Sequence, residues 1–372
     1  MTSDGDGAVQ AAAHRANNFD FVRVVAALCV LLSHQYALSG LPEPTLWQLH
    51  SLGGIGVLVF FTISGFLVAQ SWQADPHAGR FAARRLLRIW PGLAALTLLL
   101  ALVWGPLVSS LGAADYLRHP LLLKYFNNLR FSFRDALPLR LDGNALPTAV
   151  DGSLWTIPLE LKCYLALALL GLAGLLRARW VVPVLTLLCV AVYVAAGPRG
   201  AATMEVFDQN IQKLFLFEFG LFFFAGVACW RLQPFADGRR ALLCTAAGWA
   251  LGSAAWAAGQ PFLALWFVLP VTTLALGTAS LPLLRRAGRF GDLSYGLYIY
   301  AFPVQQTLIW LCRDTLPWGA VLGLTVLSTF ALAFASWHLV EKRALRLKPR
   351  KPRLEPAGWT RPETASARAD NG

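Results

Sequence analysis

Long apolar runs alternate with short polar segments over almost the whole chain. Ten of these runs reach the length of roughly 17 to 25 residues that a helix needs to cross a lipid bilayer. They cover residues 20–39, 53–72, 86–108, 154–176, 180–197, 213–230, 241–258, 262–281, 292–311 and 318–340. The pattern predicts an all-α protein, a polytopic membrane helix bundle of about ten transmembrane helices. An even number of crossings places both chain ends on the same side.

Basic residues predict the orientation of this bundle. Lys and Arg gather in every second connection and in the C-terminal tail, whereas residues 40–52 contain none. The long loop 109–153 breaks the bias, but its basic residues alternate with aspartates. Because cytoplasmic loops carry an excess of Lys and Arg, we predict that both termini are cytoplasmic.

The two ends of the chain differ from the apolar middle. Residues 1–18 are small and polar and predict a disordered cytoplasmic leader. Residues 344–372 are basic and rich in proline, which predicts a disordered cytoplasmic tail lying against anionic lipid. The membrane domain then occupies residues 19–343. Its first run is too long for a secretory signal and carries an internal Arg and His, so we expect an uncleaved first span.

Composition agrees with a membrane protein. The chain is 56% hydrophobic and 14% charged, with a formal net charge of +12. A basic protein can bind nucleic acid, but here the basic residues form short clusters between apolar runs, which is the pattern of membrane topology. We therefore expect membrane lipids and no nucleic acid as partners. The six cysteines lie in or beside apolar runs without CxxC spacing, so no metal site or disulfide framework is indicated.

The first apolar run carries polar residues that a bilayer normally excludes. Arg23 and His34 are eleven residues apart, close to three helical turns, so they share one helix face about 16 Å apart along the axis. An arginine near the surface can extend its charge to the headgroups. An imidazole at the depth of His34 is a candidate functional residue.

A carboxylate in the fourth run is the predicted partner of this imidazole. Counted from the outer ends of their spans, Glu160 and His34 both lie about 9 Å deep, so we predict that they meet. A carboxylate raises the basicity of an imidazole and fixes its tautomer, as a general base requires. The alternatives are a buried pair that only holds the bundle together, or Glu218 as the partner. Four histidines fall in predicted loops and receive no role: His14, His50, His77 and His119.

The second run is rich in small residues. Its glycines allow close helix packing, and they are Gly53, Gly54, Gly56 and Gly65. Ser64 lies near the middle of this run. Its hydroxyl can bind a substrate or only its own backbone.

Four arginines stand at the cytoplasmic start of the third span: Arg80, Arg84, Arg85 and Arg88. Arg85 and Arg88 are three residues apart and can face one way on a helix. Their forked donors suit a phosphate ligand. Positive-inside anchoring explains the same residues equally well, and the sequence leaves both interpretations open.

Aromatic residues mark the ninth run. Tyr295, Tyr298 and Tyr300 are typical of the interfacial belt of membrane proteins, and we favour that interpretation. The last run ends with His338 and Glu341 near the cytoplasmic boundary. There we expect His338 to be a boundary residue rather than a ligand.

Six elements in this order resemble those of the acyltransferase-3 family, whose members move acyl groups onto carbohydrates at the cytoplasmic membrane. They are FDFVR at 19–23 with the histidine at 34, FFTISGF at 60–66, RRLLRIWP at 84–91, SLWTIPLE at 153–160, SYGLY at 294–298 and WHLVE at 337–341. The likeness extends from about residue 18 to 343. Many members have a histidine after the SYxxY element, where this chain reads YAFP, so that segment receives no role.

The resemblance implies a donor site and a base. An acyl-CoA, expected to be acetyl-CoA, would place its phosphates on Arg85 and Arg88, with Arg84 and Ser64 as further contacts. Its thioester would reach His34, which takes a proton from the acceptor hydroxyl. In this scheme Glu160 orients His34 or the sugar.

Four further residues belong to this scheme, and Arg23 among them is grouped with the catalytic residues. Arg23 lines the channel or pairs with Asp20, and Tyr295 with Tyr298 supports the substrate. No metal is implied.

The implied acceptor is a cell-surface or exported carbohydrate, such as a polysaccharide, a lipid-linked repeat unit or lipopolysaccharide. The implied location is the cytoplasmic (inner) membrane. Loop 109–153 is expected to help select the acceptor.

Two other classes of function remain. A proton-coupled transporter of free or lipid-linked sugar would use His34 and Glu160 as a relay. Transport needs no CoA site, so the arginine cluster favours the enzyme. A structural scaffold would leave the intramembrane histidine and glutamate unexplained.

Overall fold

A computed structural model of the chain describes residues 17–46, 49–195 and 209–349. Most of the predicted leader and tail, residues 1–16 and 350–372, lies outside this described part. Each predicted run corresponds to a helix: α2 (Phe19–Leu38), α3 (Leu52–Ala74), α4 (Ala78–Leu99), α8 (Thr156–Leu172), α9 (Val181–Ala195), α10 (Gln209–Leu232), α11 (Gly238–Ala257), α12 (Pro261–Thr278), α13 (Ser294–Cys312) and α14 (Trp318–Ser336).

Short elements extend or connect these helices. A π-helical segment, Leu100–Trp104, continues α4 into α5 (Gly105–Val108), and a second one, Trp337–Glu341, continues α14 into α15 (Lys342–Leu345). The strands β1 (Thr45–Leu46) and β2 (His50–Ser51) pair antiparallel, and no other strand occurs in the described residues. The all-α class is therefore confirmed.

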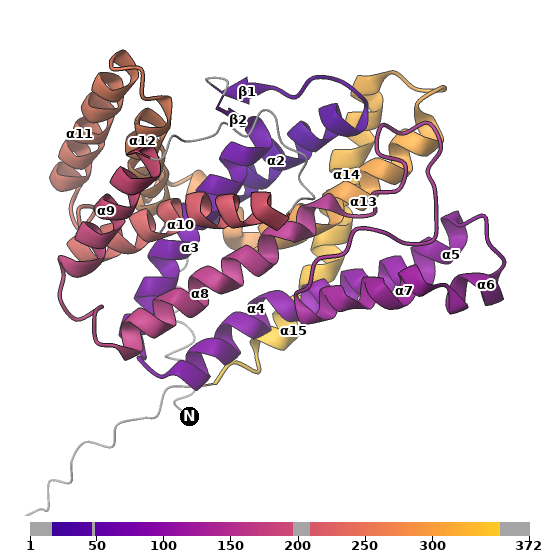
Figure 1. Ribbon diagram of the computed structural model, residues 1–372, viewed down its shortest axis with the longest axis horizontal. Coiled ribbons are helices and arrows are strands. Elements are labelled where there is room, and N and C mark those ends of the chain that lie inside the picture. The colour runs from indigo at the N-terminus through magenta and orange to yellow at the C-terminus, as the bar shows by residue number, and fades with distance from the viewer. Residues whose placement is uncertain (1–16, 47–48, 196–208, 350–372) are drawn as a thin grey trace, which may run out of the picture.

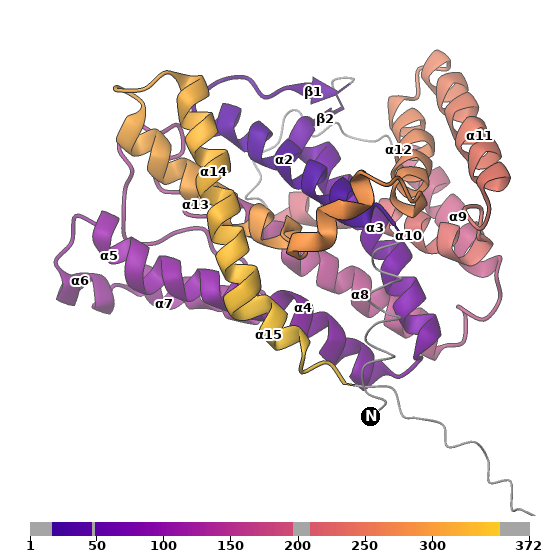
Figure 2. The same cartoon turned by 180° about the vertical axis from the view of Figure 1, so that it is seen from behind.

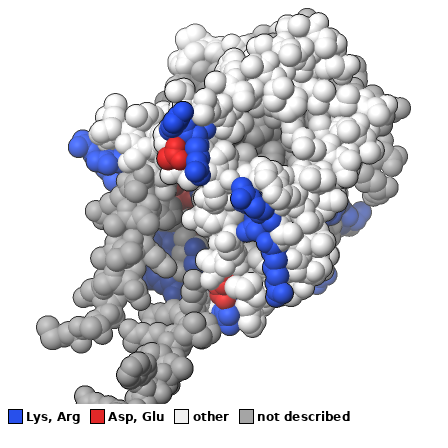
Figure 3. Space-filling model, turned by 90° about the vertical axis from the view of Figure 1, so that its left-hand side faces the viewer, with Lys and Arg blue, Asp and Glu red and all other residues white. Residues whose placement is uncertain are grey.

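Among the described residues, seven helical segments are long and apolar enough to cross a membrane: Phe19–Leu38, Leu52–Ala74, Ala78–Val108, Gly152–Leu172, Phe215–Leu232, Pro261–Thr278 and Trp318–Leu345. Helix α9 is apolar but shorter. The surface fits a lipid environment, because side chains such as Leu107 and Leu242 are 80% and 70% exposed. On the face in Figure 3, Lys and Arg form separate groups on a largely uncharged surface. The described part thus supports a multi-pass membrane protein, and ten crossings with cytoplasmic termini stay predictions.

Helix α3 runs through the centre of the bundle, between α2 and α10 (Figure 1). A Cβ added to Gly65 would lie 1.8 Å from the carbonyl oxygen of Phe223, and one added to Gly226 would lie 2.1 Å from that of Thr62. The backbones of α3 and α10 therefore meet where only glycine fits. The packing role that the sequence predicted for Gly65 is confirmed.

Close packing also joins α2 to α3 side by side. A Cβ on Gly56 would lie 2.5 Å from the carbonyl oxygen of Ala26, and one on Gly53 would lie 2.9 Å from Cβ of Ser33. Ser33 and His34 are therefore level with the start of α3. The β1–β2 hairpin covers this end of the bundle, which we call the ribbon end.

The opposite end holds the turn from α3 to α4 and the end of α15; we call it the basic end (Figure 1). Asp75 organises its turn. The carboxylate accepts hydrogen bonds of 2.9 and 2.6 Å from Arg80 and one of 2.6 Å from Arg84. These hydrogen bonds hold the pKa of Asp75 well below its usual range. Arg84 is thus used to fix the turn.

Loop 109–153 is folded rather than extended. It includes α6 (Ala113–Arg118) and α7 (Pro120–Tyr125), and Tyr116 and Tyr125 are fully buried. Asp135 accepts hydrogen bonds from the backbone N–H groups of Val150 (2.9 Å) and Asp151 (2.5 Å). These bonds fix the 3₁₀ turn Gly152–Trp155, from which α8 begins.

Two helices close the back of the bundle. Figure 2 shows α14 and α15 as one long helix that crosses this side next to α13. Gln305 of α13 donates a hydrogen bond of 2.7 Å to the carbonyl of Leu31 in α2, and Gln306 donates to those of Leu146 and Ala149. Helix α13 therefore holds both α2 and the long loop in place.

Candidate active site

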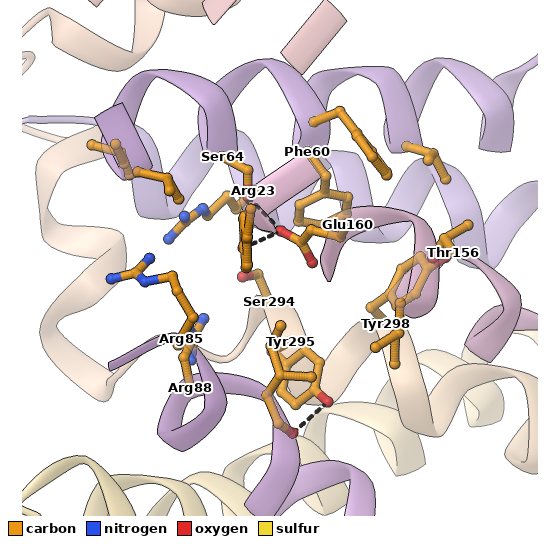
Figure 4. A pocket seen from close by; sticks show the side chains of 17 residues that line it. Arg23, Phe60, Ser64, Arg85, Arg88, Thr156, Glu160, Ser294, Tyr295 and Tyr298 are labelled. Atoms are coloured by element: carbon orange, nitrogen blue, oxygen red, sulfur yellow. Dashed lines mark hydrogen bonds between the residues drawn. The ribbon is translucent and has the colours of Figure 1, made fainter. Parts of the chain in front are cut away.

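A narrow cavity of about 100 Å³ lies where α3, α4, α8 and α13 meet. We call it the middle cavity. Figure 4 shows the arginines Arg23, Arg85 and Arg88 on one side of it and Thr156 with Tyr298 on the other. Residues from five of the six sequence elements, at 19–23, 60–66, 84–91, 153–160 and 294–298, line this single space.

Ser64 and Glu160 meet in the middle of this cavity (Figure 4). The Ser64 hydroxyl donates a hydrogen bond of 2.5 Å to Oε1 of Glu160, and the Tyr164 hydroxyl donates one of 2.5 Å to the same oxygen. Two hydroxyl donors thus hold one oxygen of Glu160 in place. Ser64 is therefore tied to α8 rather than only to its own backbone.

Asp292 joins two of the predicted arginines. Its Oδ2 accepts hydrogen bonds from Arg23 (3.2 Å) and Arg88 (2.5 Å), and its Oδ1 accepts one of 2.6 Å from Ser294. The preceding Gly291 has φ +109°, and its missing Cβ leaves room for the indole of Trp337. This aspartate was not singled out from the sequence, where only its position two residues before the SYxxY element marks it.

The arginines also approach an acid from the last helix. Nη1 of Arg88 lies 3.6 Å from Oε2 of Glu341, whose other oxygen accepts a hydrogen bond from Ser336. Arg88 thus lies between two carboxylates and connects α4 to Asp292 and Glu341.

Arg85 has a different environment. No ion pair holds it among the described residues, and its Nε is buried without a hydrogen-bond partner. The guanidinium lies 6.0 Å from the centre of the Tyr164 ring. Unlike Arg23 and Arg88, Arg85 is therefore not held by a carboxylate of the described residues.

A second cavity of about 470 Å³ adjoins the middle one at the basic end; we call it the basic cavity. The two share walls formed by Arg23, Arg85 and Arg88. Arg285 and Lys348 complete the cationic lining, and Asp20 lies there against Gly288. Burial, followed by the charges of Arg85 and Arg88, lowers the pKa of Lys348 to about 8. Such crowding of cations favours an anionic ligand. Arg84 lines neither cavity, contrary to its predicted place in a cofactor site.

The tyrosines of α13 face inward, so the interpretation as an interfacial belt is wrong for them. Tyr295 donates a hydrogen bond of 2.8 Å to the carbonyl of Ile89, and Tyr298 donates one of 3.0 Å to that of Ser153. Tyr298 also hydrogen-bonds the hydroxyl of Thr156 at 2.7 Å. Both side chains line the middle cavity and fix α13 against α4 and α8.

His34 lies in a third cavity, of about 540 Å³, at the ribbon end. We call it the ribbon cavity. The Nδ1 atom of His34 is buried without a hydrogen-bond partner, and the ring meets Phe302 edge-on, with centroids 5.3 Å apart. Val57 and Tyr298 line both this cavity and the middle one. Phe302 belongs to the YAFP segment to which the sequence assigned no role.

The predicted pair of His34 and Glu160 does not form. His34 is level with Gly53 at the start of α3, whereas Glu160 bonds Ser64, eleven residues further along α3, or about 16 Å. The prediction placed Leu154 at the membrane surface. In the structure, the fold of loop 109–153 carries Leu154 inward, and this side chain is only 3% exposed.

An imidazole–carboxylate pair exists elsewhere, between residues that the sequence did not combine. Nε2 of His50 lies 2.5 Å from Oε1 of Glu218, and both side chains are buried. His50 lines the ribbon cavity. No motif marks it, and its only sequence signal is a position immediately before the apolar run of α3.

A family model described as an acyltransferase domain matches residues 17–338. The chain belongs to the acyltransferase-3 family. It is 32% identical to an O-acetyl transferase of Shigella phage Sf6, over 89% of this chain and 97% of the relative. It is also 30% identical to Nodulation protein 10 of Rhizobium leguminosarum bv. viciae, over 90% and 94%. No solved structure gives a significant match.

Family membership confirms the resemblance and the class of reaction. The protein is an acyltransferase, and its likeness to an O-acetyl transferase over nearly the whole length supports transfer to oxygen. The same finding disfavours the transporter and the scaffold. For this acyltransferase-3 protein, the three adjoining cavities are the candidate active site.

Proposed function

We propose that the protein transfers an acetyl group from acetyl-CoA to a hydroxyl of a cell-surface or exported carbohydrate at the cytoplasmic membrane. One observation carries this proposal: the basic, middle and ribbon cavities adjoin through shared walls. The basic cavity is cationic, the middle cavity is narrow, and the ribbon cavity is wide and contains His34, whose Nδ1 has no hydrogen-bond partner. These three properties suit, in turn, a nucleotide phosphate, an extended thioester arm and an acceptor.

The donor would enter at the basic cavity. Arg85, Arg285 and Lys348 supply cationic donors for phosphate groups. Arg23 and Arg88 are held by Asp292 and form the wall beyond. The narrow middle cavity then admits only a slender chain such as the pantetheine arm. Glu160, fixed by Ser64 and Tyr164, is placed to accept a hydrogen bond from an amide of that arm, as a positioning residue.

The chemistry would take place beside His34. The imidazole takes the proton of the acceptor hydroxyl while the hydroxyl oxygen attacks the thioester carbonyl. The carbon–sulfur bond breaks, and the imidazolium returns its proton to the leaving thiolate of CoA. An O-acetyl ester and free CoA result. Edge-on packing against Phe302 holds the ring in one orientation.

The decisive experiment follows radiolabelled acetyl-CoA in membranes containing the wild type, His34→Ala or Arg85→Ala. We expect label in glycan fractions with the wild type only, with the three proteins present at equal levels. His34→Gln serves as a second variant that keeps a polar side chain of similar length. Labelling by both His34 variants at the wild-type rate would contradict the assigned base. Movement of sugar without any labelled product would support a transporter instead.

A further inference from the structure

The ribbon cavity contains a second imidazole that the proposed reaction does not use. The side chains of His50 in β2 and Glu218 in α10 are only 3% and 4% exposed. Nε2 of His50 lies 2.5 Å from Oε1 of Glu218, and the Tyr193 hydroxyl donates a hydrogen bond of 3.0 Å to Oε2. The two oxygens of one buried carboxylate therefore contact two side chains: Tyr193 by a hydrogen bond and His50, at the cavity, as an ion-pair partner.

The contact with Glu218 determines which nitrogen of His50 is left for a ligand. A carboxylate beside Nε2 favours the tautomer that carries its proton there, so Nδ1 keeps a lone pair. Gly54 lies beside this nitrogen, and a Cβ added to it would be 3.2 Å away. Glycine at this position keeps Nδ1 uncrowded. His50 lines the cavity while Glu218 stands behind it.

The remaining walls of the ribbon cavity suit a sugar ring. Ser33 donates a hydrogen bond to Glu43, so a carboxylate is held at the rim. Trp155 supplies an aromatic surface, supported by Phe215 and Phe219 with ring centroids 5.1 and 5.7 Å away. A hexose has hydroxyls around its edge and apolar C–H groups on its faces, and these wall groups complement both. The volume of about 540 Å³ is within the range of small-molecule sites.

We propose that His50 is an acceptor-binding residue: its Nδ1 accepts a hydrogen bond from a hydroxyl of a neutral hexose seated on Trp155. Glu218 and Tyr193 are positioning residues that hold the ring of His50. This inference rests on the proposed function and places its carbohydrate substrate in the ribbon cavity. The two imidazoles then have separate roles, with His50 binding the sugar and His34 taking its proton.

Binding can be measured without the donor. We suggest saturation-transfer difference NMR on the full-length protein in detergent, with a panel of 4-nitrophenyl hexosides as probes. Sugar-ring protons should give signals with the wild type and with the control Tyr36→Phe, because Tyr36 packs on Trp318 outside the cavity. His50→Ala should reduce these signals at least fivefold. The proposal is overturned if no hexoside gives ring-proton signals with the wild type, or if His50→Ala leaves them unchanged.

Other variants separate loss of binding from loss of folding. His50→Ala leaves a buried carboxylate unpaired, which can unfold the protein. The double variant His50→Leu with Glu218→Gln removes the imidazole without leaving that charge, and it should also lose the signals. His50→Asn keeps an acceptor close to the position of Nδ1 and should retain binding within about fivefold. Equal binding by the double variant and by His50→Asn would refute the role of His50.

Kinetics distinguish this inference from the proposed function. With a hexoside that is acetylated, His50→Asn and Glu218→Gln should raise the acceptor KM severalfold and leave the KM for acetyl-CoA unchanged. Transfer with an unchanged acceptor KM in both variants would refute the role of His50 and leave the proposed function intact. Hexoside binding that depends on His50, without transfer from acetyl-CoA, would refute the proposed function and leave the role of His50 intact.

Discussion

Arg88 in α4 donates a hydrogen bond of 2.5 Å to Asp292, a residue 204 positions later in the chain. Asp292 also binds Arg23 of α2, so one carboxylate joins the first, third and ninth predicted runs beside the middle cavity. The arginines that the sequence assigned to the donor site or its channel are therefore of two kinds. Arg23 and Arg88 are held by a protein acid, whereas no ion pair holds Arg85 among the described residues.

Removing Asp292 should destabilise the protein and abolish activity. Asp292→Ala leaves two partly buried guanidinium groups without their shared acid, and loss of one partner of a buried pair costs about 3–5 kcal/mol. Thermal unfolding in detergent, followed by tryptophan fluorescence, measures this effect. Asp314→Ala is the matched control, because that carboxylate is 84% exposed and pairs only with its neighbour Arg313. A melting temperature of Asp292→Ala equal to that of the control would contradict the linking role.

Arg84 and Arg85 are adjacent, but their replacement should have different effects: loss of Arg85 should weaken donor binding, and loss of Arg84 should lower stability. Arg85→Ala should raise the KM for acetyl-CoA tenfold or more, because its unpaired guanidinium faces the proposed donor path. Arg84→Ala should lower the melting temperature and change this KM little, because Arg84 binds Asp75 instead. Steady-state kinetics over a range of acetyl-CoA concentrations compares the two. The assignment fails if Arg84→Ala has the larger effect on KM.

Gly65 should tolerate no side chain. Gly65→Ala places a Cβ 1.8 Å from the carbonyl oxygen of Phe223, so α3 and α10 must separate. We expect a loss of about 3 kcal/mol or more, at or above the upper end for overpacked sites, together with poor expression. Gly323→Ala in α14 meets no atom within 4 Å and should be neutral or slightly stabilising. Comparable melting temperatures for these two variants would show that the helices are not in backbone contact.

The long loop should be more stable at acidic pH. Burial raises the pKa of Asp135 from 3.8 to about 7, and burial together with Asp135 raises that of Asp151. Between about pH 4 and pH 7, Asp135 is protonated in the folded protein and ionised in the unfolded chain. The contribution of protonated Asp135 to stability is therefore complete below about pH 4 and is lost as the pH rises to about 7. The resulting decrease in the free energy of unfolding is of the order of 4 kcal/mol at most.

Melting temperatures measured between pH 4.5 and 7.5 test this pH dependence. The wild type should melt at lower temperature as the pH rises. Asp135→Asn cannot ionise and should flatten the profile, whereas Asp115→Asn, at an exposed position on the same loop, should not. A wild-type profile that rises with pH would show that Asp135 is ionised in the folded loop.

The sequence by itself determined the helices and the family, and it singled out seven of the seventeen residues that line the middle cavity. Apolar length is a local property, so each predicted run corresponds to a helix. Three glycines of α3, Gly53, Gly56 and Gly65, were correctly assigned to helix packing, because small residues let helix backbones approach closely. Six short motifs in order sufficed to indicate the acyltransferase-3 family, which the family match confirms.

Only the tertiary structure decided which polar groups meet. The pairing of His34 with Glu160 was inferred from depth along each helix, and it failed because the fold of loop 109–153 carries the start of α8 inward. A different imidazole–carboxylate pair forms, between His50 and Glu218, which are 168 positions apart in the chain. The sequence also did not show that Asp292 binds Arg23 and Arg88 but not Arg85. Each contact depends on where separate helices are placed, and the close approach of their backbones at α2, α3 and α10 fixes those positions.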